Sequence, residues 1–142
     1  HECSSAASDV YKRQSIDWVS TAFDKSDGGT LSATVLFNEK VTVDTSGGTP
    51  TLSVTNGNQG SGSGRGPHLL AYASGSSTNK LTFSLAIGAA NAATAADDVL
   101  SFGSNPLALN SGTIVDSAEG GNATITSAAS IGTAAGTITV TA

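Results

Sequence analysis

The feature that most constrains this chain is the stretch Thr30–Asn56, in which short apolar runs with period-two alternation are separated by turn residues. Successive side chains of a β-strand point to opposite faces, so this alternation predicts strands with one buried side. The first run carries its apolar residues at every second position: Leu31, Ala33, Val35 and Phe37. A second clean run has the same spacing: Leu81, Phe83, Leu85 and Ile87.

The same pattern continues along the chain and predicts about seven to nine short strands, the arrangement typical of an all-β sandwich with Greek-key connections. The candidate strands are Ile16–Ala22, Thr30–Phe37, Val41–Val43, Thr51–Thr55, His68–Ser74, Lys80–Ile87, Val99–Phe102, Leu107–Leu109, Thr113–Val115 and Gly136–Thr141. In the predicted core, Val35 and Phe37 face Leu81, Phe83 and Leu85 across the sandwich interior, together with Ile138 and Val140.

Turn residues and glycines predict the connections. We expect a turn at Asn38–Lys40, because three polar residues interrupt the apolar alternation there. Asn56–Pro67 is dominated by glycine and serine, and we predict a long mobile loop with no residue in the core. The alanines of Gly88–Asp98 predict one or two helical turns, with Asn91 as a candidate N-cap.

Composition limits the classes of function. The 142 residues fit one domain, and the net charge of −5 disfavours nucleic-acid binding because an acidic surface repels phosphates. No apolar run approaches the roughly 20 residues that span a bilayer, so we expect no membrane insertion. Cys3 is the only cysteine, which excludes an intramolecular disulfide.

The first residues have a different origin from the rest in our interpretation. Ser4–Gln14 reads SSAASDVYKRQ and resembles a translated sequencing adaptor over all eleven residues. We therefore interpret residues 1–14 as a disordered artefact and residues 15–142 as a single domain. A genuine polar N-terminal arm is the alternative.

Catalytic and metal-binding patterns are sparse. His68 is the only histidine after the adaptor-like segment, and we expect it at the surface without a catalytic role. The glycine-rich sequence GSGSGRG fits neither a nucleophile elbow nor a phosphate-binding loop. Calcium needs only oxygen ligands, so several carboxylates are candidates for binding it. We nevertheless favour the interpretation that these carboxylates are solvated side chains in turns. These candidates are Asp24, Asp27, Asp97, Asp98, Asp116 and Glu119.

A binding site for sugars or receptors would need exposed aromatic or polar side chains. For the only tryptophan, Trp18, a core or edge anchor is preferred to a ligand platform. The candidates for such a binding site are Trp18, Arg65, His68 and Tyr72.

Three segments carry a resemblance to a known family. VLFNEKVTVDTSGGTPTLSVTNG, AYASGSSTNKLTFSLAI and LALNSGTIVDSAEG occur in the order that is typical of a bacterial Ig-like repeat family. The resemblance implies an Ig-like sandwich that serves as a non-enzymatic structural or display module, in a phage virion or at a bacterial surface. It also implies partners among other domains or subunits of a larger assembly. A module that binds a carbohydrate or host receptor through loops at one end remains the alternative.

Overall fold

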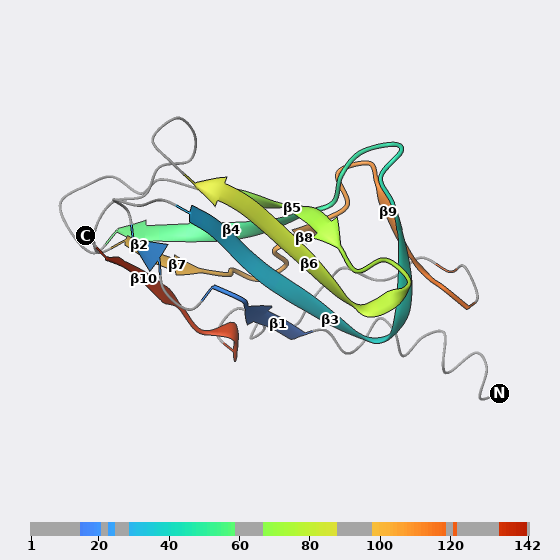
Figure 1. Cartoon of the computed structure of the whole chain (residues 1–142), viewed down its shortest axis with the longest axis horizontal. Coiled ribbons are helices and arrows are strands. Elements are labelled where there is room, and N and C mark those ends of the chain that lie inside the picture. The colour runs from blue at the N-terminus through green and yellow to red at the C-terminus, as the bar shows by residue number, and fades with distance from the viewer. Residues whose placement is uncertain are drawn as a thin grey trace.

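The computed structural model describes residues 15–20, 23–24, 29–58, 67–87, 98–118, 121 and 134–141. These residues contain ten strands, so the predicted all-β class is confirmed (Figure 1). The ten candidate segments form nine strands, because Thr30–Phe37 and Val41–Val43 both belong to β3, and the two-residue strand β2 is an addition that was not predicted. The strands are β1 (Ser15–Trp18), β2 (Phe23–Asp24), β3 (Gly29–Asp44), β4 (Thr51–Asn58), β5 (His68–Ser74), β6 (Thr78–Ile87), β7 (Asp98–Ser101), β8 (Leu107–Ala108), β9 (Thr113–Asp116) and β10 (Ile138–Thr141).

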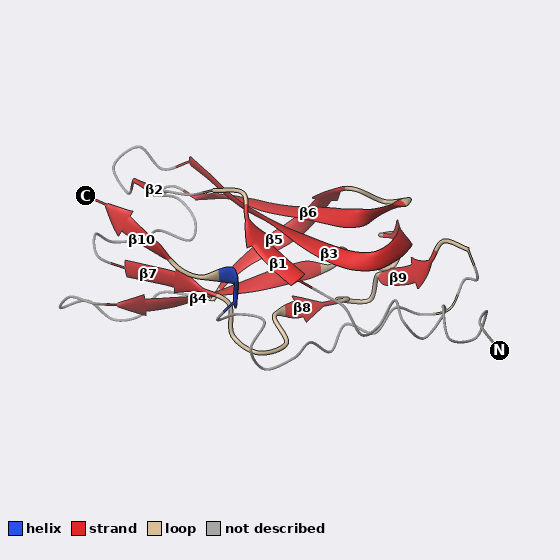
Figure 2. Cartoon of the chain, turned by 90° about the horizontal axis from the view of Figure 1, so that it is seen from below, coloured by secondary structure: helices blue, strands red, loops and turns tan. Residues whose placement is uncertain are grey.

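Hydrogen bonds join the strands into one path in the order β1-β3-β6-β5-β4-β7-β10-β2, while β8 pairs with β4 and β9 with β3. Nine strands pair antiparallel, and β2 joins β10 in parallel. The sheet curls strongly, so that β6 lies on one side of the interior and β4 and β7 lie on the other (Figure 2). This half-barrel shape encloses a single core.

The predicted turn at Asn38–Lys40 is wrong, because β3 runs unbroken through it for 16 residues. The inward face continues from Phe37 through the half-buried Glu39 to Val41, so the alternation is kept across the polar residues. The register of β3 with β6 shifts between Leu36 and Val41, and the pairing on the other edge changes from β1 to β9. A register shift of this kind bends a strand without ending it.

The predicted hairpin between β5 and β6 is confirmed, with a tighter turn than expected. Thr78 N–H donates to the Gly75 carbonyl at 3.0 Å, so β6 begins at Thr78. Gly75 has φ of +110°, and a Cβ at this position would lie 2.2 Å from the carbonyl oxygen of Lys80. Only glycine fits this backbone without distortion.

The core combines residues from both sides of the curled sheet. It contains Ile16, Leu31, Ala33, Val35, Phe37, Val41, Leu52, Val54, Leu70, Leu81, Phe83, Ile87, Leu100, Phe102, Leu107, Ile114, Ile138 and Val140. The predicted facing of β3 and β6 across the interior is wrong, because these strands are hydrogen-bonded neighbours. Val35 lies opposite Leu81 in the register, and Ala33 lies opposite Phe83. Their side chains are therefore lateral neighbours on the same inward face.

Several predicted boundaries change. β1 ends at Trp18 rather than Ala22, and β4 extends to Asn58, so the first three residues of the predicted loop Asn56–Pro67 are strand. Asn56 is buried, which contradicts the prediction that this loop contributes nothing to the core. The adaptor-like segment and the predicted helix lie outside the described residues, apart from Asp98, which begins β7.

Candidate functional site

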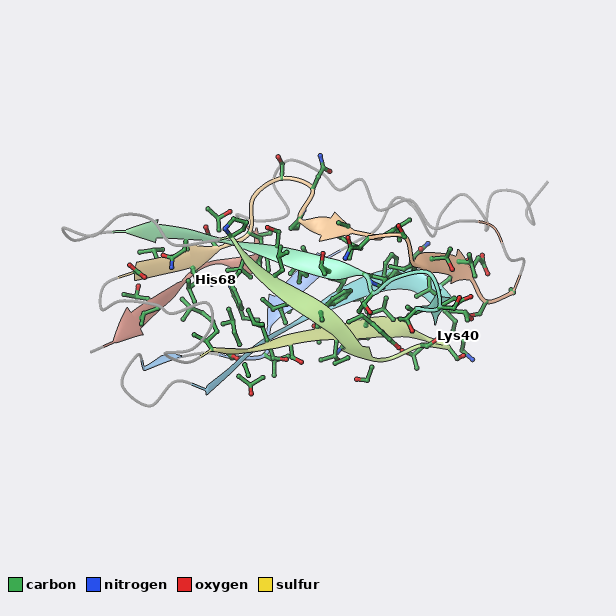
Figure 3. The ribbon with its side chains drawn as sticks, turned by 90° about the horizontal axis from the view of Figure 1, so that it is seen from above. Lys40 and His68 are labelled. Carbon is green, nitrogen blue, oxygen red and sulfur yellow. The ribbon has the colours of Figure 1, made fainter. Side chains whose placement is uncertain are left out.

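His68 begins β5 and is buried, with 1% of its surface exposed, so the prediction of a surface histidine is wrong. Its neighbour Leu69 is half-exposed and Leu70 is fully buried. His68 therefore shares the inward face of β5 with Leu70, as strand alternation requires. Figure 3 shows His68 and Lys40 far apart along the length of the molecule.

Two further polar residues are buried and linked to His68. Asn56 lies in β4 and Asp98 in β7, and 8% and 0% of their surfaces are exposed. Asn56 Nδ2 lies 3.0 Å from His68 Nε2 and donates a hydrogen bond to Asp98 Oδ2 at 3.0 Å. We call Asn56, His68 and Asp98 the polar trio.

The environment of the trio favours a neutral imidazole. Burial lowers the pKa of His68 below its ordinary value, and the negative charge of Asp98 acts against this effect. Among the described residues, His68 Nδ1 and Asn56 Oδ1 have no hydrogen-bond partner. A buried network that is only partly satisfied contributes less stability than a complete one.

The arrangement differs from that of a nucleophilic enzyme. Such an enzyme places a hydroxyl or thiol against one nitrogen of the histidine. Here Nε2 faces the amide of Asn56, and no hydroxyl within the described part of the chain bonds to either ring nitrogen. The chemistry that the trio supports is hydrogen bonding between three strands.

Asp116 lies at the other end of the molecule and is also buried, with 2% of its surface exposed. Its Oδ1 accepts a hydrogen bond from Ala118 N–H at 2.7 Å, and its own N–H donates to the Gly121 carbonyl at 2.7 Å. Asp98 and Asp116 thus contradict the prediction of solvated turn carboxylates. The side chain of Asp116 stabilises the chain reversal that follows β9.

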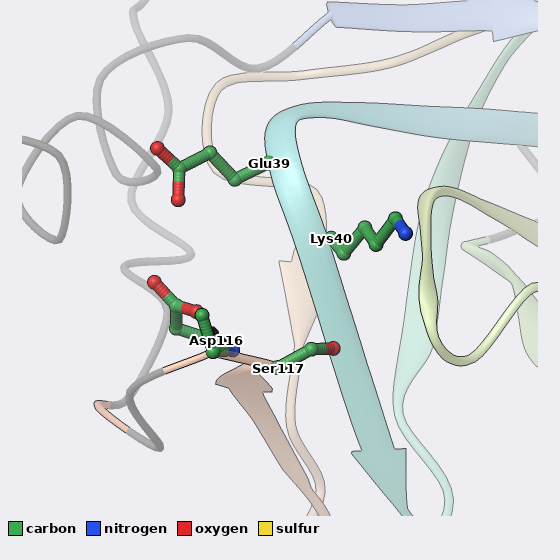
Figure 4. Close-up of a pocket in the computed structure, with 5 residues that line it drawn as sticks. Glu39, Lys40, Asp116 and Ser117 are labelled. Atoms are coloured by element: carbon green, nitrogen blue, oxygen red, sulfur yellow. Dashed lines mark hydrogen bonds between the residues drawn. The ribbon is translucent and has the colours of Figure 1, made fainter.

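Asp116 also lines an open pocket of about 370 Å³ together with Glu39, Lys40, Ser117 and Ala118. Figure 4 shows the carboxylates of Glu39 and Asp116 on one side of β3 and the Lys40 side chain on the other. Of these two carboxylates, that of Asp116 is buried, so the half-buried Glu39 supplies the more accessible one.

The calcium candidates do not assemble into one site. Asp98 begins β7 and Asp116 ends β9, and these two strands lie toward opposite ends of the molecule (Figure 1). Asp27, Asp97 and Glu119 lie outside the described residues, and so does the side chain of Asp24. Within the described ranges, no three histidine, cysteine or carboxylate side chains form a group that could hold a metal ion.

The aromatic candidates for ligand binding are engaged within the domain. The half-buried Trp18 ring stacks on Phe102 with centroids 4.3 Å apart, and its Nε1 donates to the Gly136 carbonyl at 3.2 Å. The Tyr72 hydroxyl accepts from Ser76 N–H at 2.9 Å, and its ring packs against that of Phe83 in a T-shaped arrangement. These contacts agree with an anchoring role for Trp18.

The structure therefore places Trp18 on β1 and both His68 and Tyr72 on β5, each with internal partners, while Arg65 lies outside the described residues. Sequence reasoning missed Asn56 as a partner of His68. The inward position of His68 was detectable from its alternation with Leu70. Its link to Asn56 and Asp98 depends on the pairing of β4 with β5 and β7.

Comparison with protein-family models, with curated proteins and with solved structures finds no match. In the described part of the chain, no helix has the length and apolar character needed to cross a membrane.

Proposed function

We propose that the chain is a non-enzymatic structural or display module with an Ig-like Greek-key fold, carried by a phage virion or a bacterial surface protein. Its partners are other domains or subunits of a larger assembly. The observation that carries this proposal is the strand order, which supports the fold independently of the motif resemblance.

In an immunoglobulin constant-type domain, strands A, B, E and D form one sheet and strands C, F and G form the other. We assign letters A to G, in chain order, to β1, β3, β4, β5, β6, β7 and β10. The hydrogen-bonded path then reads A-B-E-D-C-F-G. The two sheets of the Ig arrangement follow one another along this path, joined by the pairing of β5 with β4. β2 follows A in the chain and pairs with G.

The ends of two connections meet at one end of the domain, which favours a display role. The chain leaves β4 after Asn58 and reaches Pro67 before β5, and it leaves β6 after Ile87 and enters β7 at Asp98. Asn58 and Asp98 are register partners, so both connections depart from paired strands. The polar trio lies near the start of these connections and links β4, β5 and β7. A base built from paired strands suits the presentation of the connections that leave it.

Sequencing the DNA that flanks this reading frame tests the structural role. We expect neighbouring capsid or tail genes, or a long reading frame that repeats this domain. A single-domain frame within an operon of metabolic enzymes would contradict the proposal.

A ligand-binding module is the second candidate, and it is favoured by the meeting of the two connections at one end. A glycan array probed with the full chain tests it. Binding that disappears when residues 59–66 are replaced by a Gly-Ser linker of equal length would favour carbohydrate recognition. Absence of binding at high protein concentration would count against it.

A further inference from the structure

The polar trio joins residues that lie far apart in the sequence through a single amide group. Asn56 is separated from His68 by 12 positions and from Asp98 by 42. Its Nδ2 lies 3.0 Å from an acceptor on each of them. The amide thus connects β5 and β7 through β4, which lies between them in the sheet.

The geometry determines which way the amide faces. If the amide were reversed, Asn56 Oδ1 would face Asp98 Oδ2, and two acceptors would repel one another. With Nδ2 in this position, both of its hydrogens are used, and His68 Nε2 must accept one of them. The proton of the neutral ring therefore lies on Nδ1. Protonation of Nε2 would place an N–H group against the amide N–H, and this hydrogen bond would be lost.

The charges around His68 are few. Among the described residues, Asp98 on β7 is the charged group that acts on it, while β4 and β10 carry no ionisable side chain; Arg65 and Asp97 lie outside the described ranges. Lys80 of β6 pairs with Leu36, whereas Ile87 at the other end of β6 lies nearest to the start of β5. The side chain of Asp24 in β2 is outside the described residues. Burial opposes the charged form of His68 and lowers its pKa despite Asp98.

We propose that the polar trio is an acid-sensitive junction, in which protonation of His68 separates β5 from the β4–β7 pair and loosens the end of the domain where residues 59–66 and 88–97 depart. This property goes beyond the structural role proposed above. His68 is neutral in the folded chain at neutral pH and binds a proton more readily when unfolded. Its contribution to stability is therefore complete above the unfolded pKa of about 6.5 and is lost as the pH falls through the folded pKa.

NMR of the full chain between pH 7.5 and 4.5 tests the proposal. The titration of the His68 ring is followed together with the exchange protection of backbone amides in β4, β5 and β7. We expect His68 to titrate below about 6.5. Protection of these amides should fall as the pH drops from about 6.5 to the His68 midpoint, and it should level off below that midpoint. For each unit by which the pKa of folded His68 lies below its unfolded value, the exchange protection of these amides should fall by about tenfold in total.

Two variants separate protonation from packing. In His68→Gln, the side-chain carbonyl can accept the hydrogen bond from Asn56 Nδ2 but does not titrate. The acid-induced loss of amide protection should therefore disappear. In Asp98→Asn, the amide carbonyl can still accept from Asn56 while the negative charge is removed. The His68 midpoint should then move to lower pH, together with the loss of protection, which a purely structural role would not cause. The second variant keeps the test valid if the first does not fold.

Three results would overturn the proposal. His68 could titrate at or above its ordinary value, or protection in β4, β5 and β7 could stay constant across its titration. The third result is an acid-induced loss of amide protection that persists unchanged in His68→Gln.

Discussion

Phe83 is a residue at which the predicted inward face of β6 can be tested directly. Its side chain is fully buried, and its ring packs against that of Tyr72 in a T-shaped arrangement with centroids 6.0 Å apart. Phe83→Ala removes this packing and leaves a cavity, so we expect a loss of about 3–5 kcal/mol in the free energy of unfolding. Urea denaturation followed by tryptophan fluorescence measures the loss.

Thr82 provides the matched control because it lies on the opposite face of the same strand and is only half-buried. Thr82→Ala should cost about 0.5 kcal/mol or less. Equal losses for Thr82→Ala and Phe83→Ala would mean that β6 is shifted by one residue, since such a shift exchanges the two faces.

Residue-scale prediction succeeded for apolar side chains and failed for buried polar ones. Leu81 and Phe83 were assigned to the core from period-two alternation, and both are fully buried. His68 and Asp98 follow the same rule, but their polarity favoured the surface in the absence of known partners. The partner, Asn56, is brought to them by strand pairing across 12 and 42 positions. No local pattern specifies that pairing.

At the scale of elements, the β5–β6 hairpin depends on the conformation of Gly75. In Gly75→Ala, the new Cβ meets the Lys80 carbonyl and the Leu81 Cα at 2.2 and 2.9 Å, and φ is +110°. Both contacts are to backbone, so relief requires the turn itself to move. We expect a loss of about 1–3 kcal/mol, measured as a lower midpoint of urea denaturation.

Gly57 in β4 is the matched control for this substitution. A Cβ there would lie 3.8 Å from the Val99 carbonyl, which is an ordinary contact. Gly57→Ala should leave stability unchanged or raise it by about 0.5–1 kcal/mol, because glycine in a strand has a high entropic cost. If Gly57→Ala were as destabilising as Gly75→Ala, the positive φ would not explain the effect at Gly75.

The existence of strands was predictable from sequence, but their ends were less so. Glu39 and Lys40 interrupt the apolar pattern, yet β3 continues because its edge partner changes from β1 to β9 at this point. Asn56–Asn58 resemble loop in composition, yet pairing with β7 holds them in β4. In both places, long-range hydrogen bonds overrode local preference.

At the scale of the whole molecule, the all-β class followed from alternation and turn residues, whereas the curled sheet did not. Alternation identifies an inward face but not the strand that lies beside it. β3 and β6 were therefore placed across the core from one another, although they are lateral neighbours. The continuous path arises because β4 pairs with β5 through Thr51–Val54 and with β7 through Thr55–Asn58. One strand thereby joins both sides of the curl.

The last prediction concerns residues 1–14, whose resemblance to a translated adaptor implies that they contribute nothing to the domain. The described fold begins at Ser15, and the pairing of β1 with β3 is complete between Ser15 and Trp18. Trp18 stacks on Phe102, which also lies within the described residues. Deletion of residues 1–14 should therefore leave the melting temperature unchanged within error in differential scanning calorimetry. A domain of this size changes its melting temperature by several degrees for each 1 kcal/mol, so even a modest contribution would be detected. A fall of several degrees would show that this segment packs against the domain and is a genuine part of it.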